Sequence, residues 1–566
     1  MASLAVLLSE DARSSQHTRL TKILDFFGVP WKAVEGSELR GLAEQNDRYA
    51  LLGSSTAIAD AVARLEAAGQ LSWPQGIYVY LNEDREVSER AIRSICGNPQ
   101  LSLKALRGRI SLLVHPRLTE ITGPLAGIEV SAEASSEDAA CDGVSLEDPN
   151  CTTIISAGPS PVFAKVQRSG VPIYICTSSH IVDIEEPLKL NYYDVKSRFC
   201  SAVPVVMFIR ATFSEVAWHS QESGACLIVD DPLLERRYGH CDFELLRQLM
   251  RQHGFTTNVA FIPWNWRRTS ASASDFFVNE ADRFSVSVHG CDHIKAEFGD
   301  PSLAVLSARA RLAQTRMRRH ETRTGIRHDA VMVFPQGVFS SICPGILKQN
   351  RFLAAVNTEV SPVDVHPAGS RIKDVWDLAI MRYGTFPIFT RRYAHHGIEN
   401  FAFDLLLGKP CLIVSHHDFF KDKCGQVVRL VESLGSLRCQ LRWRSLGEVL
   451  RRTCRRRMIS ADQMEVEMYG TELVVQNSSN HPMSATILKR ESDPDLIDTI
   501  LSDEEAISWR QEGDFLVFTE TIAARSERRF CLIYKESSAG ETERSLSFTI
   551  SVAARRLSCE IRDRYF

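Results

Sequence analysis

The stretch GACLIVDDPLL, residues 224–234, ends a run of strand-forming residues with two adjacent aspartates, Asp230 and Asp231. Like charges this close repel, and burying either carboxylate is unfavourable unless a cation or a hydrogen-bond network compensates. A structural interpretation also exists, because a helix N-cap and a first-turn acid before Pro232 would use the same residues. The stretch therefore indicates either a chemical site or a capped helix at the end of a strand.

The same stretch begins a longer alternation of strands and helices between residues 216 and 455. Helical patterns such as FELLRQLMRQHG (243–254) separate the apolar runs. Seven strands with intervening helices predict a (β/α)7-type barrel, in which chemistry lies at the C-terminal ends of the strands. The seven runs are GACLIVDD (224–231), TTNVAFIP (256–263), FSVSVHG (284–290), DAVMVFPQG (329–337), FLAAVNT (352–358), LAIMRYG (378–384) and PCLIVSHH (410–417).

Two histidines, His289 and His293, stand four residues apart where the third run ends. On a single helical turn both imidazoles would face the same way and could share one metal ion. An aspartate and two histidines form a three-ligand site that leaves positions open, which is typical of catalytic zinc. One aspartate could then bind the cation while its neighbour remains a base. Cys291 should point away from this site, so we do not count it as a ligand.

At these residues the sequence resembles the polysaccharide deacetylase family, the NodB-homology carbohydrate esterases. The family's first motif, Asp-Asp at the end of the first barrel strand, matches Asp230 and Asp231. Its second motif, His-x-x-x-His, matches His289 to His293, and its last, Leu-x-Leu-x-His, is similar to the segment 412–416. The resemblance covers the barrel region only, about 240 residues of the chain.

The resemblance implies a metal-dependent hydrolase that removes acetyl groups from an N- or O-acetylated carbohydrate. Asp230 would be the general base and His416 the general acid. Asp231, His289 and His293 would bind Zn²⁺ or another divalent metal. The implied partner is a carbohydrate or glycoconjugate substrate.

Two family features are missing from the chain. The third motif, Arg-x-Pro-x-Gly, appears as VFPQG, with Val333 at the arginine position. The family arginine pairs with the base, so we expect either that Arg382 takes this task or that Asp230 has a higher pKa than a paired aspartate. No clear Asp-x-x-Asp-Trp is present, since DVWD (374–377) has these residue types in the wrong order.

Further residues near the expected strand ends are predicted to contact substrate. Trp264 and Trp266 could stack on a sugar ring, although aromatic residues are more often part of the core. His417 is the alternative to His416 as the acid, and strand register favours His416. The predicted substrate-binding residues are Trp264, Asn265, Pro335, Gly337, Arg382 and His417.

Other patterns flank the barrel, so the sequence predicts an α/β multidomain protein. Residues 1–130 alternate short strands with helices and predict an open α/β, flavodoxin-like domain with a mainly parallel sheet. Residues 131–215 are interpreted as an acidic, serine-rich linker (131–150) and a strand-rich extension, which either completes the first domain or stands apart. Period-two patterning over 456–566 predicts a β-sandwich-like domain, with a strand and then a helix at its end.

Composition limits the classes of partner and location. The net charge of −4 gives no reason to expect nucleic acid. No stretch approaches the ~20 apolar residues of a membrane span, and the N-terminus lacks the basic region of a signal peptide. The 15 cysteines are scattered through apolar segments, which favours reduced thiols in the cytoplasm.

Two other functions remain open from the sequence. A catalytically inactive carbohydrate-binding or assembly protein on the same fold would explain the missing arginine. A barrel glycoside hydrolase would need two opposed carboxylates and would leave the histidine pair unexplained. Stoichiometric metal would favour the deacetylase over both.

Overall fold

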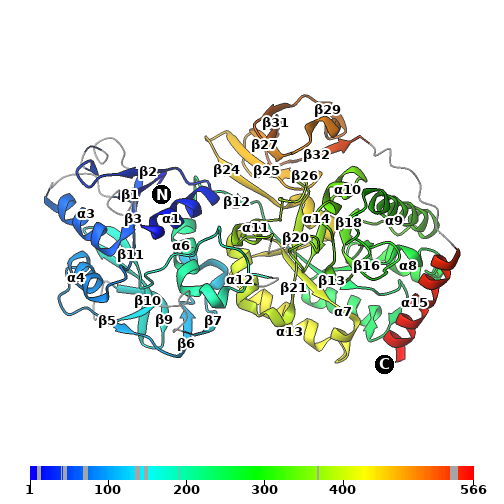
Figure 1. Ribbon diagram of the computed structural model, residues 1–566, viewed down its shortest axis with the longest axis horizontal. Helices are drawn as coiled ribbons and strands as arrows, with labels where there is room; N and C mark the ends of the chain where they lie inside the picture. The colour runs from blue at the N-terminus through cyan, green and yellow to red at the C-terminus, as the bar shows by residue number, and fades with distance from the viewer. Residues whose placement is uncertain are drawn as a thin grey trace.

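The computed structural model describes most of the 566-residue chain. The described residues are 1–8, 14–39, 41, 48–67, 74–133, 141–145, 151–189, 192–365, 369–535 and 546–565. The chain forms an N-terminal β-sheet, then a barrel, then a pair of C-terminal sheets. Figure 1 shows the N-terminal sheet beside the barrel and the C-terminal sheets above the barrel.

The N-terminal part is built on a nine-stranded mixed sheet in the order β2-β1-β3-β4-β11-β10-β9-β6-β7. Its first five strands are parallel and follow the 2-1-3-4-5 order of flavodoxin-like sheets, and the other four are antiparallel. The strands are β1 (Leu4–Leu8), β2 (Trp31–Val34), β3 (Tyr49–Ser54), β4 (Ile77–Tyr80), β6 (Arg109–Val114), β7 (Glu129–Glu133), β9 (Cys151–Ala157), β10 (Ser160–Arg168) and β11 (Val171–Cys176). The strand-rich segment 151–176 thus belongs to this sheet.

Helices cover both faces of this sheet because alternate strand residues point to opposite sides. Leu7 packs with residues of α1 (Ser15–Phe26) and α6 (Phe199–Thr212), whereas Val6 packs with residues of α3 (Ser55–Ala67) and α4 (Arg85–Cys96).

The acidic segment expected to be a linker lies partly outside the described residues, at 134–140 and 146–150. Between these gaps, β8 (Asp142–Ser145) pairs with β5 (Ser102–Ala105). At least this part of the segment is therefore strand.

The middle of the chain forms a nearly closed parallel barrel in the order β20-β19-β18-β17-β16-β13-β22-β21. The two edge strands, β20 and β21, are consecutive in the chain and are separated by Arg391 alone. One kinked segment therefore closes the barrel. The strands are β13 (Ser223–Asp230), β16 (Thr257–Phe261), β17 (Phe284–His289), β18 (Val331–Val333), β19 (Ala354–Asn357), β20 (Ile388–Thr390), β21 (Arg392–Tyr393) and β22 (Cys411–Ser415), with β23 (Leu441–Trp443) beside β13.

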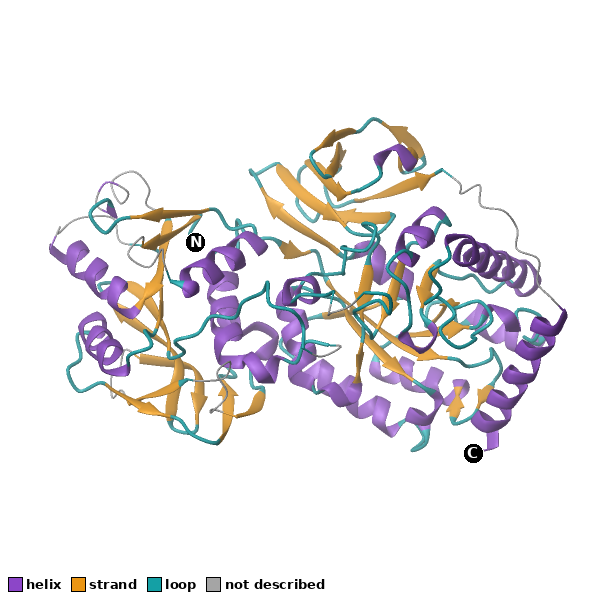
Figure 2. Ribbon diagram, in the orientation of Figure 1, coloured by secondary structure: helices purple, strands orange, loops and turns teal. Residues whose placement is uncertain are grey.

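Helices surround the barrel strands, as Figure 2 shows. On β13, Ile228 packs in the barrel interior, whereas Val229 packs toward the helices, so both faces are apolar. The helices are α7 (Phe243–His253), α8 (Ala271–Asn279), α9 (Leu303–Thr324), α10 (Cys343–Gln349), α11 (Ile372–Trp376), α12 (Ile398–Leu407), α13 (Gly425–Ser436) and α14 (Leu446–Arg452).

Six of the seven apolar runs become barrel strands, and the prediction for LAIMRYG (378–384) is wrong. Residues 378–380 are buried, but only an isolated antiparallel bridge from Ile380 to Ile388 forms there. Burial against the barrel, without a neighbouring strand to pair with, explains the apolar pattern. The strands in this place are β20 and β21, whose short sequence IFTRRY gave no strand signal.

After the barrel, two sheets stack face to face on one core. Their orders are β12-β24-β25-β27-β31-β30 and β26-β32-β28-β29, in which β29 (Glu505–Ile507) and β30 (Arg510–Glu512) are short edge strands. Val466 and Phe518 of the first sheet share this core with Val475 and Phe530 of the second. The main strands are β24 (Cys454–Met458), β25 (Gln463–Met468), β26 (Glu472–Gln476), β27 (Met483–Arg490), β28 (Ile497–Ser502), β31 (Phe515–Ile522) and β32 (Glu527–Tyr534), joined by β12 (His219–Ser220).

The last described element is a helix, α15 (Leu546–Tyr565), and not the expected strand and helix. Figure 1 shows α15 beside α8 on the barrel, away from the sheets that precede it in the chain. A sandwich over 456–566 is therefore wrong for this final segment. Among the described helices, none combines the length and apolar character needed to cross a membrane.

Candidate metal centre

The two adjacent aspartates lie at the C-terminal end of β13, in the middle of the barrel sheet. Asp230 is the last residue of the strand, and Asp231 follows it with φ +81°. A non-glycine residue with positive φ is uncommon and typical of functional sites held in place by their surroundings. The backbone turn at Asp231 gives the two carboxylates different partners.

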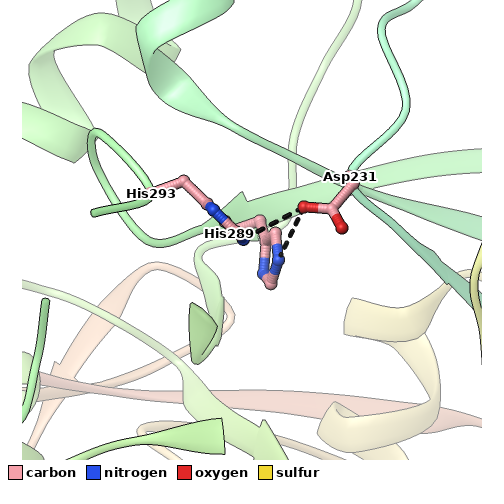
Figure 3. A group of neighbouring side chains, drawn as sticks. All are labelled: Asp231, His289 and His293. Atoms are coloured by element: carbon pink, nitrogen blue, oxygen red, sulfur yellow. Dashed lines mark ion pairs between the residues drawn. The ribbon is translucent and has the colours of Figure 1, made fainter. Parts of the chain in front are cut away.

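Asp231 lies against the two predicted histidines. Its Oδ1 is 3.4 Å from His289 Nε2 and 3.0 Å from His293 Nε2, as the dashed lines in Figure 3 mark. His289 is the last residue of β17, and His293 follows it in a loop with φ +57°. The histidines are thus brought together by a strand end and a loop, and not by the helical turn expected from their spacing.

A buried carboxylate, Glu297, holds the loop that carries His293. Its Oε2 accepts hydrogen bonds from the backbone N–H groups of Cys291 (2.9 Å) and His293 (3.1 Å), and its Oε1 accepts one from Asp292 (2.7 Å). Glu297 is 1% exposed. Three backbone donors on one carboxylate fix the loop's conformation and so the position of the His293 ring.

The donor set fits a divalent metal. Asp231 Oδ1 is buried and receives no well-aligned hydrogen bond among the described residues, although two imidazole nitrogens lie within ion-pair distance. His289 Nδ1 donates to the Val333 carbonyl at 3.0 Å, which leaves Nε2 with its lone pair toward Asp231. Ligands about 2.1 Å from a tetrahedral metal lie about 3.4 Å apart, close to the separations found here.

Electrostatics favour an anionic Asp231 in this buried site. Burial by itself raises the pKa of Asp231, but interaction with His289 and His293 outweighs it and holds that pKa well below the ordinary value. Burial lowers the pKa of His289, and Asp231 and Asp230 together raise it above its usual range. An anionic aspartate within reach of two imidazoles is a suitable environment for a cation.

Asp230 pairs with an arginine that the sequence analysis missed. Arg391 donates from Nη1 and Nη2 to the two carboxylate oxygens of Asp230, both at 2.7 Å, and both side chains are 4% exposed. Burial raises the pKa of Asp230, but Arg391, with smaller effects of His289 and His416, brings it below its ordinary value. The expectation of a raised pKa for Asp230 is therefore wrong.

Arg382 and Val333 have other positions. Arg382 pairs with Asp374 at 3.0 Å and does not line the cavity that contains the candidate metal-binding triad, Asp231, His289 and His293. Val333 lies opposite His289 on the neighbouring strand and is fully buried in the barrel interior. The arginine expected at position 333 is replaced by Arg391, 58 residues further along the chain.

The triad lines a cavity of about 320 Å³ at the barrel's C-terminal end. His416 lines this cavity, and its ring stacks on Tyr393 with centroids 6.2 Å apart. His417 lies instead near Tyr238 and His240. The cavity is lined by Asp230, Asp231, His289, His293, Gln336, Gly337, Thr358, Glu359, Arg391, Tyr393, His416, Arg555 and Cys559.

Of the predicted substrate-binding residues, only Gly337 lines this cavity. Pro335 is buried beneath the loop at Gly290. Trp264 carries the Arg316 guanidinium over its ring at 5.2 Å, and Asn265 is 1% exposed. Trp264 and Asn265 therefore pack at the end of the barrel and do not line the cavity.

A second group of metal-ligand side chains, Cys291, Asp292 and Glu297, lies behind the first. Asp292 pairs with Arg316 at 2.6 Å, and Glu297 is occupied by backbone N–H groups. These partners explain the cluster as loop structure.

Three residues of the site, Arg391, Glu297 and Arg555, were not predicted from the sequence. Arg391 follows IFT (388–390), a segment too short to be recognised as a strand from its pattern. Glu297, four residues after His293, and Arg555, in the C-terminal segment, carried no signal.

No protein-family model matches the chain, and no curated protein sequence matches it. Solved structures similar to about two fifths of it include the following three. The family 4 carbohydrate esterase from Streptomyces lividans shares 13% identity over 38% of this chain and 89% of that chain, with a TM-score of 0.24. The chitin deacetylase from Colletotrichum lindemuthianum shares 15% identity over 41% and 89%, with a TM-score of 0.25. A Thermoplasma acidophilum protein provisionally described as part of a GMP synthase shares 14% identity over 38% and 96%, with a TM-score of 0.25.

Proposed function

We propose that the chain is a metal-dependent hydrolase that removes acetyl groups from an N- or O-acetylated carbohydrate. The observation that carries the proposal is the convergence of Asp231, His289 and His293, with the arginine-paired Asp230 beside them. A divalent ion such as Zn²⁺, held by these three residues, would polarise the acetyl carbonyl and acidify the attacking water.

Asp230 is the general base in this proposal. Its lowered pKa keeps it ionised, and the two-point contact with Arg391 fixes the direction of its oxygen atoms. It takes one proton from the attacking water as the new C–O bond forms. Positioning of a base in this way contributes about 10²- to 10⁴-fold to the rate.

His416 is the general acid. It lines the same cavity as Asp230 but comes from the end of β22, one strand away from β13. As the C–N or C–O bond of the acetyl group breaks, His416 protonates the leaving amine or alcohol and acetate is released. The ring of Tyr393 against His416 supports its orientation.

The turn at 335–337 is a candidate for oxyanion stabilisation. The N–H groups of Gly337 and Val338 donate to carbonyls within the turn. The N–H of Gln336, whose backbone has φ +58° and whose residue lines the cavity, is therefore the proposed donor to the tetrahedral oxyanion.

The bidentate Arg391–Asp230 pair also favours an active enzyme over the inactive alternative. That alternative depended on the missing family arginine, and Arg391, between β20 and β21, supplies an equivalent charge. An adjoining depression of about 660 Å³ shares Tyr393 and His416 with the cavity, which leaves room for the rest of a glycan.

Acetate release from a panel of acetylated sugars by the zinc-loaded protein tests the proposal. Asp230→Asn should retain the metal and lose about 10²- to 10⁴-fold in rate. Unchanged turnover in Asp230→Asn on a substrate that the wild type hydrolyses would show the mechanism to be wrong.

A further inference from the structure

The C-terminal helix α15 forms part of the wall of the candidate active site. Its inward face includes Val552, Arg556 and Glu560, which are 2%, 6% and 8% exposed. The Glu560 carboxylate accepts hydrogen bonds from both terminal nitrogens of Arg268, at 2.7 and 2.9 Å. Arg268 follows β16, so this ion pair fixes α15 to the same end of the barrel as the triad.

Two side chains of α15, Arg555 and Cys559, line the cavity that contains the triad. They lie four residues apart and therefore on one face of the helix. Every other residue that lines the cavity comes from the barrel, between residues 230 and 416. The helix thus adds a second arginine to the cavity, beside Arg391 of the barrel.

Arg555 is a half-buried cation that has no carboxylate within 4.0 Å among the residues that the structure describes. The other arginine of the cavity, Arg391, already pairs with Asp230 through both terminal nitrogens. Glu359 lines the same cavity but forms no ion pair with Arg555. A guanidinium presents several donors in a fixed plane, which match a carboxylate or another oxyanion.

We propose that Arg555 selects the substrate by binding an anionic group on the acetylated sugar. The substrate class is then an acidic acetylated sugar, such as one with a uronic carboxylate. That the substrate carries an acetyl group rests on the proposed deacetylase function. That it carries a negative charge rests on Arg555 of α15 alone. Arg555 acts as a specificity residue and takes no part in proton transfer.

Binding measurements on the full-length, zinc-loaded protein test this inference, with Asp230→Asn present in every variant and in the reference protein, called wild type in this comparison, so that turnover is slow. The probes are N-acetylglucosamine and 2-acetamido-2-deoxyglucuronic acid, which differ only by a hydroxymethyl group and a carboxylate. Calorimetry should give about tenfold tighter binding of the acid by the wild type, since a charge-assisted contact contributes about that much. Arg555→Gln should remove the preference and leave the neutral sugar unaffected, and Arg555→Lys should retain part of it.

Arg525→Gln is the matched control, because Arg525 is an exposed arginine in a turn of the last sheets and changes the net charge equally. It should keep the full preference. Equal affinity of the wild type for both sugars, or an undiminished preference in Arg555→Gln, would overturn the inference. A protein that prefers the acid but releases no acetate would contradict the proposed function and leave the role of Arg555 intact.

Discussion

At the scale of single residues, the two adjacent aspartates are tolerated because they have opposite kinds of partner. Asp230 faces the guanidinium of Arg391, whereas Asp231 faces two imidazoles that can hold a metal ion with it. Each carboxylate therefore has compensating charge on its own side, and the repulsion between neighbours is outweighed. The positive φ of Asp231 makes this division possible.

Arg391 should control the acid limb of the pH profile. Removing its charge in Arg391→Met raises the pKa of Asp230, so less of the base is ionised at a given acidic pH. The acid limb of kcat/KM should then move to higher pH by about one unit or more. Arg391→Lys should move it less, because the positive charge remains.

Arg382→Gln is the control for this measurement, because Arg382 pairs with Asp374 outside the cavity. Its acid limb should match the wild type. A shift in Arg382→Gln, with none in Arg391→Met, would reverse the assignment.

Glu297 should act as a positioning residue for His293. In Glu297→Gln one carboxylate oxygen becomes an NH₂ group that faces a backbone donor, so the loop loses at least one hydrogen bond. Zinc affinity should fall about 10- to 100-fold, as for outer-sphere partners of metal ligands. Equilibrium dialysis measures the zinc affinity. Glu321→Gln is the control, because Glu321 lies on α9 and pairs with His328, and this variant should bind zinc normally. Unaltered zinc affinity in Glu297→Gln would exclude the role.

The triad and His416 could be predicted from sequence because each follows an apolar run, but the partner of Asp230 could not. Val333 and Arg382 both lie nearer to recognisable motifs than Arg391 does. Only the closure of the barrel brings the segment between β20 and β21 next to β13, and strand order is not contained in any local pattern.

At the scale of elements, the loop after β17 requires glycine at position 290. Gly290 has φ +66°, and a Cβ there would meet the Pro335 ring and lie 2.5 Å from Glu297 Oε2. Gly97 has nearly the same φ, +65°, with open space around it. The two glycines therefore separate backbone strain from crowding.

Gly97→Ala should lower the free energy of unfolding by about 1 kcal/mol, the cost of the left-handed conformation alone. Gly290→Ala should lower it by about 2 to 4 kcal/mol, because overpacking adds to the same strain. Urea denaturation of both variants measures the difference. Equal losses would mean that the loop can move away from Pro335 and Glu297.

Two elements show where local patterns mislead. The alternation LSFTISV (546–552) is typical of a strand, yet it forms the start of α15, in which Ile550 is 68% exposed and Val552 is 2% exposed. No strand edge pairs with this segment among the described residues, and the same helix is held against the barrel further along by the ion pair between Glu560 and Arg268. Likewise residues 378–380 of the apolar run LAIMRYG are buried without becoming a barrel strand. In both cases the segment's partner, and not its local pattern, determines its conformation.

At the scale of the whole molecule, all three candidate metal-binding side chains come from the barrel, while residues of α15 complete the cavity. A protein that ends at Lys535 should therefore still bind one zinc ion per chain. Metal analysis after gel filtration measures this, and His293→Ala in the same shortened chain should lose the metal. A folded shortened protein without zinc would mean that α15 contributes a ligand.

The central claim is that Asp231, His289 and His293 hold one divalent metal beside a separate base. Zinc competition titration of the full-length protein with a chromophoric chelator tests it most directly, on the wild type, Asp231→Ala and Asp230→Asn. We predict one zinc ion per chain in the wild type, unchanged stoichiometry in Asp230→Asn and affinity weakened by more than about 100-fold in Asp231→Ala. A wild type without stoichiometric zinc, or an Asp231→Ala variant that binds it equally well, would contradict the account.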